Sequence, residues 1–218
     1  MKFPKEIKCI IFDMDGVIID SEEIHKKAYY ETFISLGVHV SDDVYKTLTG
    51  SSTINAFQKL VTHFNLDLDP EELVLDKRKR YVNFFENDPT LHLVNGVEEI
   101  IKYFHNNGFT LVLASSSAMV NINRVFNRFN LNQYFTAKIS GADLTASKPH
   151  PEIFEKAAAL VNTPKENCIV IEDSDNGIKA ANDAGIFVFG YRNKMAEDQT
   201  LENANFILND FSELKALI

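Results

Sequence analysis

Six short apolar runs decide the fold class of this chain of 218 residues. The runs are rich in Ile, Val and Phe and carry few charges, a composition typical of strands that are buried on both faces of a parallel sheet. Each run therefore predicts one strand. The clear runs are residues 7–12, 109–114, 168–171 and 187–191, and the weaker ones are 137–140 and 206–208.

Helical patterns separate the later runs. Residues 95–108 place apolar side chains at helical spacing and end at Gly108, a common C-terminal stop signal. Residues 174–185 begin at a serine that can cap a helix and end at another glycine. Because strands alternate with helices, the sequence predicts an α/β fold with a doubly wound, mostly parallel sheet.

One interval breaks this alternation. Between the first run and residue 109 lie about a hundred residues without a convincing strand, and three stretches within them have helical patterns. We expect a small α-helical domain at residues 19–88, inserted into an α/β core that consists of residues 1–18 and 89–218.

Charge and composition exclude several classes of partner. The formal net charge is -9 at pH 7, which argues against binding to nucleic acid or to an anionic membrane. No segment has the ~18 apolar residues that span a bilayer, and the first apolar run is too short for a signal peptide. Cys9 and Cys168 lie in predicted core strands, so we expect buried free thiols in a cytoplasmic protein, by default a monomer.

Polar residues follow several strands at the edge of the sheet where parallel strands end. In an open α/β sheet this is the edge at which ligands bind. Two aspartates follow the first strand, three serines follow the strand at 109–114, and two acids follow the strand at 168–171. One lysine precedes a helix that begins near the same edge. The residues are Asp13, Asp15, Ser115, Ser116, Ser117, Lys148, Glu172 and Asp173.

Four carboxylates at one edge indicate a cation, because they would otherwise repel one another strongly. Oxygen ligands of this kind suit Mg²⁺, which typically binds one or two carboxylates together with a substrate phosphate. A phosphate would also need the positive charge of Lys148 and hydrogen-bond donors near Ser115. The edge therefore predicts phosphoryl chemistry on a small phosphorylated metabolite.

Asp13 and Asp15 suit two different parts in that chemistry. Asp13, held by a rigid strand and kept ionised by the metal, is suited to attack phosphorus and form an aspartyl-phosphate. Asp15 can donate a proton to the leaving oxygen and then accept one from water. Gly16 allows the chain to bend away without a side chain that would obstruct the phosphate.

Four segments together resemble the motifs of the haloacid dehalogenase superfamily, and specifically its phosphatase and β-phosphoglucomutase-like branch with a helical cap. They occur in the order of that family and cover nearly the whole chain. The segments are "DMDGVIIDSE" from Asp13, the serine at 115, "SKPHPEIF" around Lys148 and "IEDSDNGIKAANDAG" around Asp173.

The resemblance implies a role for each matching position. It implies Asp13 as nucleophile, Asp15 as general acid and base, Ser115 as a phosphate donor with Ser116 beside it, and Lys148 as the stabilising cation. The implied Mg²⁺ ligands are an Asp13 carboxylate oxygen, the main-chain carbonyl of Asp15 and the carboxylate of Asp173. Whether Glu172 binds the metal directly or through water stays open.

The inserted helical domain would be the cap, and it supplies candidate substrate contacts. His25 lies where this branch often has a histidine, Gly50 fits a specificity loop, and Lys77 matches a lysine that contacts substrate. Each also has a plainer interpretation, as an exposed histidine, a loop glycine and a solvated lysine. The basic run at 77–80 is expected to be mostly a solvated helix face.

Two residues favour hydrolysis over the mutase reaction. Sugar phosphomutases of this branch carry a lysine and an arginine where this chain has Thr49 and Thr53. A mutase must hold a second phosphate in the cap, and losing two charge-assisted contacts at about 1.5–3 kcal/mol each weakens that hold roughly a hundredfold or more. Dehalogenating members of the superfamily lack an acid at the position of Asp15, so its presence favours phosphate esters as substrates. We therefore expect a phosphatase, with a phosphomutase as the alternative.

A hypothesis from another class is a non-catalytic phospho-receiver or binding module, which can also combine acids, a hydroxyl group and a lysine on a parallel sheet. Such a module would be about half as long and would lack the helical insertion. We therefore rank it below both enzymes.

Overall fold

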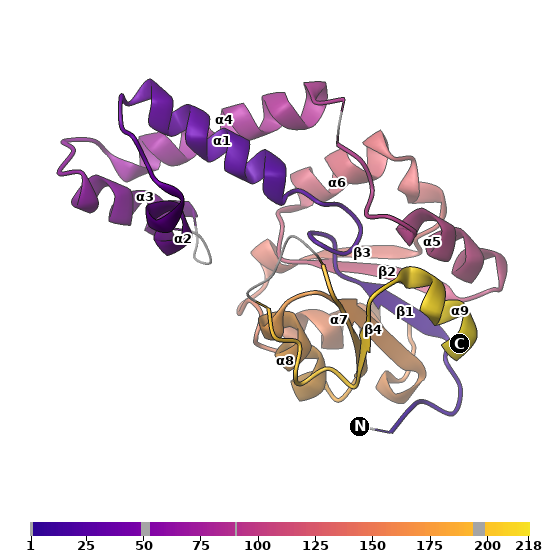
Figure 1. Ribbon diagram of the computed structural model, residues 1–218. Helices are drawn as coiled ribbons and strands as arrows, with labels where there is room; N and C mark the ends of the chain where they lie inside the picture. Colours follow the sequence, from indigo (N-terminus) through magenta and orange to yellow (C-terminus); the bar gives the residue numbers. More distant parts are fainter. Residues whose placement is uncertain (1, 49–52, 90, 194–198) are drawn as a thin grey trace. The chain divides into compact units, whose positions relative to one another are not determined.

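The computed structural model describes residues 2–48, 53–89, 91–193 and 199–218, and the chain divides into two compact units (Figure 1). The α/β unit comprises the chain up to Asp20 and from His92 to Ile218, and the helical unit comprises Ser21–Leu91. None of the helices in the described parts of the chain is both long enough and apolar enough to cross a membrane.

The α/β unit is built on one six-stranded sheet with the strand order β3-β2-β1-β4-β5-β6, and all neighbouring strands are parallel. This confirms the predicted doubly wound sheet, and the strand ends differ from the predicted ones by at most two residues. The strands are β1 (Cys9–Phe12), β2 (Thr110–Ser115), β3 (Ala137–Ser140), β4 (Cys168–Glu172), β5 (Phe187–Tyr191) and β6 (Phe206–Leu208).

Helices cover both faces of the sheet, as Figure 1 shows, because side chains of successive strand residues point to opposite faces. Cys9 and Ile11 of β1 pack with α7 and α8 on one face, whereas Phe12 faces Phe126 and Phe135 on the other. The helices of this unit are α5 (Val97–Asn106), α6 (Met119–Arg128), α7 (Glu152–Leu160), α8 (Asp175–Ala184) and α9 (Leu214–Leu217). Short 3-10 turns are η1 (Leu131–Gln133), η2 (Gly141–Asp143), η3 (Lys165–Asn167) and η4 (Phe211–Glu213).

The two cysteines are neighbours in the core of this unit. Cys9 of β1 and Cys168 of β4 lie opposite each other in the strand register, and both are buried free thiols, as predicted. The hydrogen bond with the Cys168 thiol, together with burial, raises the pKa of Cys9 far above its ordinary value, so Cys9 stays protonated.

In its described residues the helical unit has four helices around its own apolar core, in which α1 packs along α4 and α3 also packs on α4. The helices are α1 (Glu22–Ser35), α2 (Asp42–Leu48), α3 (Thr53–His63) and α4 (Pro70–Asn87). Asp69 caps α4 by accepting the Glu71 N–H, and Pro70 occupies the first turn.

The boundaries of the units differ slightly from the predicted 19–88. Ile19 forms bridges with Asp15 and with Leu93, and Ile19 N–H donates to the carbonyl of Met14. These main-chain bonds keep residues 19 and 20 in the α/β unit. We propose below that the helical unit acts as a cap.

Candidate active site

Asp13 directly follows β1 at the carboxyl edge of the sheet. Its N–H donates to the carbonyl of Ile171 in the neighbouring strand β4, so the main chain of Asp13 is fixed like that of a strand residue. The side chain is only 9% exposed. A carboxylate in such a place needs nearby positive charge, because burial without a partner strongly disfavours the ionised form.

Lys148 supplies that charge and joins two acids. Its Nζ donates to Asp13 Oδ1 at 2.5 Å, to Glu172 Oε1 at 2.7 Å and to the main-chain carbonyl of Ala114 at 3.1 Å. The side chain is 7% exposed and its amine lies 5.0 Å from the centre of the Phe154 ring. All three ammonium donors are therefore directed, and the position of the positive charge is fixed.

Glu172, the last residue of β4, uses both carboxylate oxygens. Oε1 accepts from Lys148, and Oε2 accepts from the N–H and the hydroxyl group of Ser174 at the start of α8. Gly177 leaves the space for this carboxylate, since a side chain there would overlap it. In this arrangement Glu172 holds in place both Lys148 and Ser174, the residue that caps α8 by accepting the Gly177 N–H.

Asp15 is held by the turn that follows β2. The Ser117 hydroxyl donates to Asp15 Oδ2 at 2.8 Å. That turn is itself braced, because the Ser117 N–H donates to Ser115 Oγ and the Ser140 hydroxyl donates to the Ser117 carbonyl. Ser115 is buried, whereas Ser116 beside it is exposed at the edge of the sheet.

Gly16 makes room for Asp173. It has a φ of +84°, which favours glycine, and a side chain at this position would overlap the carboxylate of Asp173. The Asn193 side-chain amide donates to the Gly16 carbonyl at 3.1 Å and fixes the loop. The sequence predicted that Gly16 would keep space for a phosphate, and the structure shows that it keeps space for an acid.

The acids at this edge disfavour one another's ionised form. Burial raises the pKa of Asp13 to about 7, although Lys148 acts in the opposite direction, and Glu172 and Asp15 raise it further. Burial also raises the pKa of Asp173 to about 9, and the charges of Glu172, Asp13 and Asp15 add to the rise. Burial disfavours the Lys148 ammonium, but Asp13 and Glu172 outweigh this and raise the pKa of Lys148.

These residues fit a divalent cation held mainly by oxygen. A cation beside Asp13 and Asp173 would lower both raised pKa values and remove the repulsion between the acids. In the described parts of the chain no three His, Cys, Asp or Glu side chains are grouped as metal ligands. The predicted set needs only two such side chains, because Asp15 would contribute its main-chain carbonyl.

Two of the residues predicted in the helical unit, His25 and Lys77, contact each other. Lys77 is only 3% exposed, and its ammonium donates to Nδ1 of His25 at 2.7 Å. Its amine lies 4.6 Å from the Tyr29 ring centre and 5.4 Å from that of Tyr81, on which the His25 ring stacks. Gly50 lies outside the described residues.

The interpretation of the basic run as a mostly solvated face is wrong for one of its members. Lys77 is buried, because it falls on the apolar face of α4 between Leu73 and Tyr81. Arg78 and Lys79 are exposed as expected.

The structure thus brings Asp13, Asp15, Lys148, Glu172 and Asp173 to one edge of the sheet. It gives Ser117, which the sequence placed at this edge without a role, a partner in Asp15. It also adds two residues that the sequence did not place in the site and for which it gave no signal: Ser140 braces Ser117, and Asn193 binds the loop after β1.

Known proteins are similar to this chain over most of its length. A family model described as haloacid dehalogenase-like hydrolase matches residues 10–191. Hexitol phosphatase B of Escherichia coli (strain K12) is 30% identical, over 83% of this chain and 82% of the relative. The β-phosphoglucomutase of Bacillus subtilis is 26% identical, over 95% of this chain and 92% of the relative.

Among solved structures, CbbY from Rhodobacter sphaeroides in complex with phosphate has a TM-score of 0.81 at 25% sequence identity. The match covers 95% of this chain and 96% of that one. The similarity therefore extends over both units in sequence.

Proposed function

The chain belongs to the haloacid dehalogenase-like hydrolase family, in the branch of phosphatases and β-phosphoglucomutases, and we propose that it hydrolyses a small phosphomonoester with the help of Mg²⁺. The observation that carries the proposal is Lys148, whose ammonium bridges Asp13 and Glu172 directly beyond the ends of β1 and β4. A phosphoryl group attacked by Asp13 would lie beside this fixed positive charge.

In the proposed first step, an oxygen of Asp13 forms a bond to phosphorus while the bond from phosphorus to the alcohol oxygen breaks. Lys148 donates to Oδ1 of Asp13. The other carboxylate oxygen, Oδ2, therefore keeps its lone pairs for the attack. Lys148 also stabilises the negative charge that spreads over the phosphoryl oxygens. The product bound to the enzyme is an aspartyl-phosphate at Asp13.

Asp15 moves the protons in both steps. Its protonated form gives a proton to the leaving alkoxide, and the resulting carboxylate accepts a proton from the water that hydrolyses the aspartyl-phosphate. The hydroxyl of Ser117 donates to Oδ2 and thereby directs the carboxyl group. Ser115 and Ser116 lie at the same edge and are proposed to donate hydrogen bonds to the phosphate.

Mg²⁺ would be held by Asp13, the main-chain carbonyl of Asp15 and Asp173. When bound, it would neutralise phosphoryl oxygens and keep Asp13 ionised. Glu172 is already committed to Lys148 and to Ser174, so we assign it to positioning Lys148 and not to direct metal binding.

We propose that the helical unit is a cap and that His25, Gly50 and Lys77 contact the substrate. Sugar and polyol phosphates are the first substrate class to test, because relatives carry the names hexitol phosphatase B and β-phosphoglucomutase. We further propose a cytoplasmic monomer that acts on a small metabolite and binds neither nucleic acid nor membranes, consistent with the net charge of -9.

Hydrolysis is favoured over the mutase reaction by Thr53, which stands where mutases of this branch carry an arginine. Thr49, in place of their lysine, lies outside the described residues. Without those two cations the cap has less positive charge for a second phosphate. Efficient conversion of β-glucose 1-phosphate to glucose 6-phosphate would reverse this ranking.

The test is phosphate release from a panel of phosphorylated sugars, polyols and nucleotides, with and without Mg²⁺, for the wild type and Asp13→Asn. Release that requires both Mg²⁺ and Asp13 is the expected result, and the best substrate in the panel gives the substrate class. If wild type with Mg²⁺ releases no phosphate from any ester and converts no sugar phosphate, the enzyme proposal is wrong and the non-catalytic phospho-binding module replaces it.

A further inference from the structure

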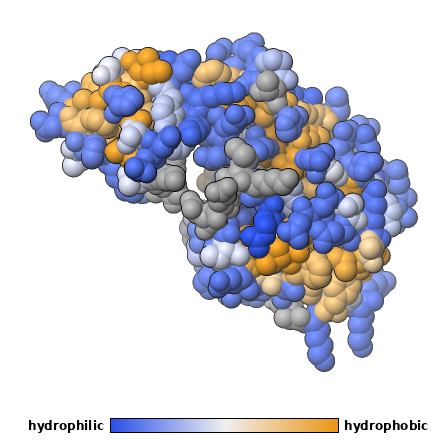
Figure 2. Space-filling view, viewed as in Figure 1, coloured by the Kyte–Doolittle hydropathy of each residue, from blue (hydrophilic) through white to orange (hydrophobic). Residues whose placement is uncertain are grey.

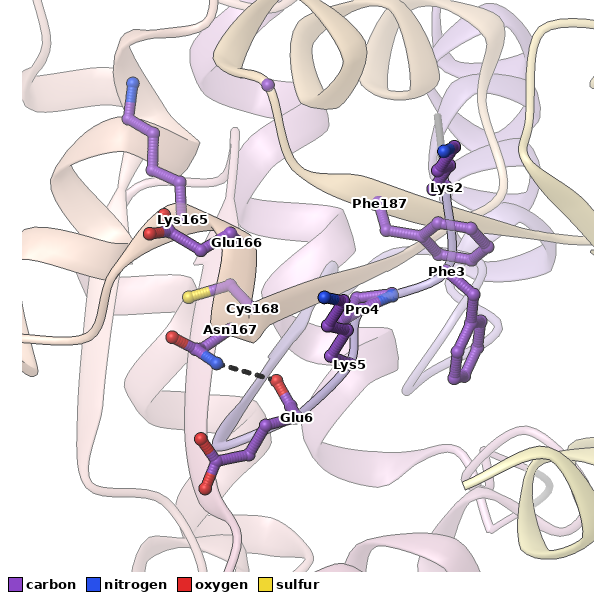
Figure 3. A pocket seen from close by; sticks show the side chains of 11 residues that line it. Lys2, Phe3, Pro4, Lys5, Glu6, Lys165, Glu166, Asn167, Cys168 and Phe187 are labelled. Carbon is purple, nitrogen blue, oxygen red and sulfur yellow. Dashed lines mark hydrogen bonds between the residues drawn. The ribbon is translucent and has the colours of Figure 1, made fainter.

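A pocket lies at the edge of the sheet opposite to Asp13. It is lined by the N-terminal segment 2–6, by η3, and by the first residues of β4 and β5 (Figure 3). These residues precede or begin their strands, whereas the candidate catalytic acids lie at or beyond the ends of β1 and β4. The two sites therefore share no residue, and an inference about this pocket does not depend on the proposed function.

The pocket is large enough for a small organic molecule. Its volume is about 450 Å³, within the range of roughly 300–1,000 Å³ that is common for ligand pockets. Figure 3 shows two walls of the pocket. Phe3 and Pro4 of the N-terminal segment form one wall, and Asn167 and Cys168 form the other.

Hydrogen bonds hold the N-terminal segment against the rest of the α/β unit. The Asn167 side-chain amide donates to the carbonyl of Glu6 at 2.8 Å, and the Lys8 N–H donates to the carbonyl of Asn167 at 2.9 Å. The carbonyl of Lys8 in turn accepts the N–H of Thr110. Both walls of the pocket are thus connected through main-chain atoms.

One part of the pocket is aromatic. The Phe3 ring is 45% exposed and meets the buried Phe187 edge to face, with 5.2 Å between ring centres. Phe187 in turn packs on Phe189 at 5.2 Å. Figure 2 shows hydrophobic side chains gathered on the lower part of the α/β unit, where Figure 1 places the N-terminus. An exposed ring supported by buried rings offers a face on which a flat aromatic ligand can stack.

The same part of the pocket carries positive charge. Lys2 and Lys5 are exposed, and within the described ranges neither forms an ion pair with a carboxylate. Glu6 is paired with Lys8 at 3.2 Å, and Lys165 is paired with Glu155 at 2.7 Å.

The remaining carboxylate of the lining is Glu166, which lies on the side opposite Phe3 in Figure 3. An anionic group would therefore bind at the Lys2 and Lys5 side. In a chain whose net charge is -9, two lysines beside exposed aromatic surface form a local positive site.

From this combination we infer that the pocket binds a small aromatic anion, whose ring stacks on Phe3 and whose phosphate or carboxylate group binds Lys2 and Lys5. Nucleotides and aromatic carboxylates share this chemistry. The phosphate of a nucleotide would form charge-assisted hydrogen bonds with both lysine ammonium groups.

The test is an NMR titration of the ¹⁵N-labelled full chain with AMP and, separately, with 1-naphthoate. The expected result is that at least one probe shifts the amide signals of Lys2, Phe3, Lys5, Glu6 and residues 165–168 and saturates. If only AMP binds, the pocket takes a phosphate ligand; if only 1-naphthoate binds, it takes a carboxylate ligand. Adenosine and ribose 5-phosphate, each lacking half of the recognised chemistry, should shift these signals much more weakly.

Variants give the second half of the test. The double variant Lys2→Ala/Lys5→Ala and the single variant Phe3→Ala should each raise the Kd of the binding probe about tenfold or more. The control Lys215→Ala changes an exposed lysine on α9 and should leave the Kd unchanged. The inference is overturned if both probes leave these amides unmoved at millimolar concentration, if they shift only signals near Asp13 and Ser115, or if the lysine and phenylalanine variants bind like the wild type.

Discussion

Among the described residues, Lys148 of the α/β unit and Lys77 of the helical unit both have almost fully buried side chains, and their surroundings differ. In the α/β unit, the Lys148 side chain is 7% exposed and its amine lies within 2.7 Å of two carboxylates. In the helical unit, Lys77 is 3% exposed, and its amine lies beside an imidazole nitrogen of His25 and two tyrosine rings.

The surroundings determine which group changes its ionisation. Asp13 and Glu172 raise the pKa of Lys148, so this charge is constant over the physiological pH range. In the helical unit the shifted group is the neighbour of the lysine: burial and the Lys77 charge lower the pKa of His25 to about 3. A lysine ammonium can only donate, so His25 is neutral with Nδ1 as acceptor and its proton on Nε2.

Burial of a lysine therefore does not by itself identify its role. Lys148 is an anchor for acids that would repel one another, whereas Lys77 fixes the tautomer of a histidine. Removing each charge should therefore have very different consequences, and the following predictions test this difference.

The largest effect is expected for Lys148→Met. This change leaves Asp13 and Glu172 buried together without their cation, which we expect to cost about 3–5 kcal/mol of unfolding free energy at pH 8. Phosphate release should fall by about 10²–10³-fold or more, because a directed positive charge is lost beside the phosphoryl group. Urea unfolding and steady-state kinetics measure the two effects.

The matched control is Lys215→Met, which replaces an exposed lysine in the same unit. Its stability should stay within about 0.5 kcal/mol of the wild type. If Lys148→Met were as stable and as active as this control, Lys148 would not be the anchor of the acids.

Glu172→Gln should have the next largest effect. The glutamine keeps the shape of the side chain but withdraws the negative charge from Lys148, so kcat should fall about 10–100-fold with a smaller change in KM, as for other supporting residues. A pH profile of kcat that shifts relative to the wild type would separate this positioning role from a purely structural one. If kcat and its pH profile were unchanged, Glu172 would not be the residue that positions Lys148.

Acid should weaken the folded state through His25. The folded pKa of about 3 lies below the ordinary 6.5, so the contribution of neutral His25 is complete above about pH 6.5 and is lost as the pH falls towards 3. Between pH 7 and pH 5 the wild type should therefore lose up to about 2 kcal/mol more unfolding free energy than His25→Gln, which cannot titrate. Parallel loss in both proteins would show that His25 titrates normally.

The smallest effect on stability is expected for Lys77→Met. Methionine has a similar volume and fits the apolar and aromatic surroundings, so the free energy of unfolding should stay within about 1 kcal/mol of the wild type. The pKa of His25, followed by NMR, should rise because the Lys77 charge is gone, but should stay below its ordinary value because burial remains. A loss as large as that of Lys148→Met would abolish the contrast between the two lysines.

Much of the fold could be predicted because its signals are local. The runs at β1 and β4 are fully buried on both faces, so their composition alone indicates a parallel sheet. The edge that carries Asp13 and Asp173 follows from the direction of the strands. The exact unit boundary could not be predicted, because it depends on the bridges of Ile19 with Asp15 and Leu93.

The details of the site were harder to predict, because they depend on distances across the fold. Ser117 and Asp15 are 102 positions apart, and which serine of the cluster reaches Asp15 is set by the turn after β2. The burial of Lys77 did have a local signal, since Leu73, Lys77 and Tyr81 recur every four residues on one face of α4. The density of positive charge at 77–80 concealed it.

The most direct test of the central claim is to look for a phosphoryl group on Asp13. Wild-type enzyme is mixed with the best substrate and Mg²⁺, quenched in acid within one turnover, digested, and analysed by mass spectrometry. The account predicts that the peptide containing Asp13 gains the mass of one phosphoryl group. In Asp15→Asn, which lacks both the acid for formation and the base for hydrolysis, the phosphorylated peptide should form more slowly and persist longer after mixing. Phosphate release without phosphorylation of this peptide in either protein would contradict the account.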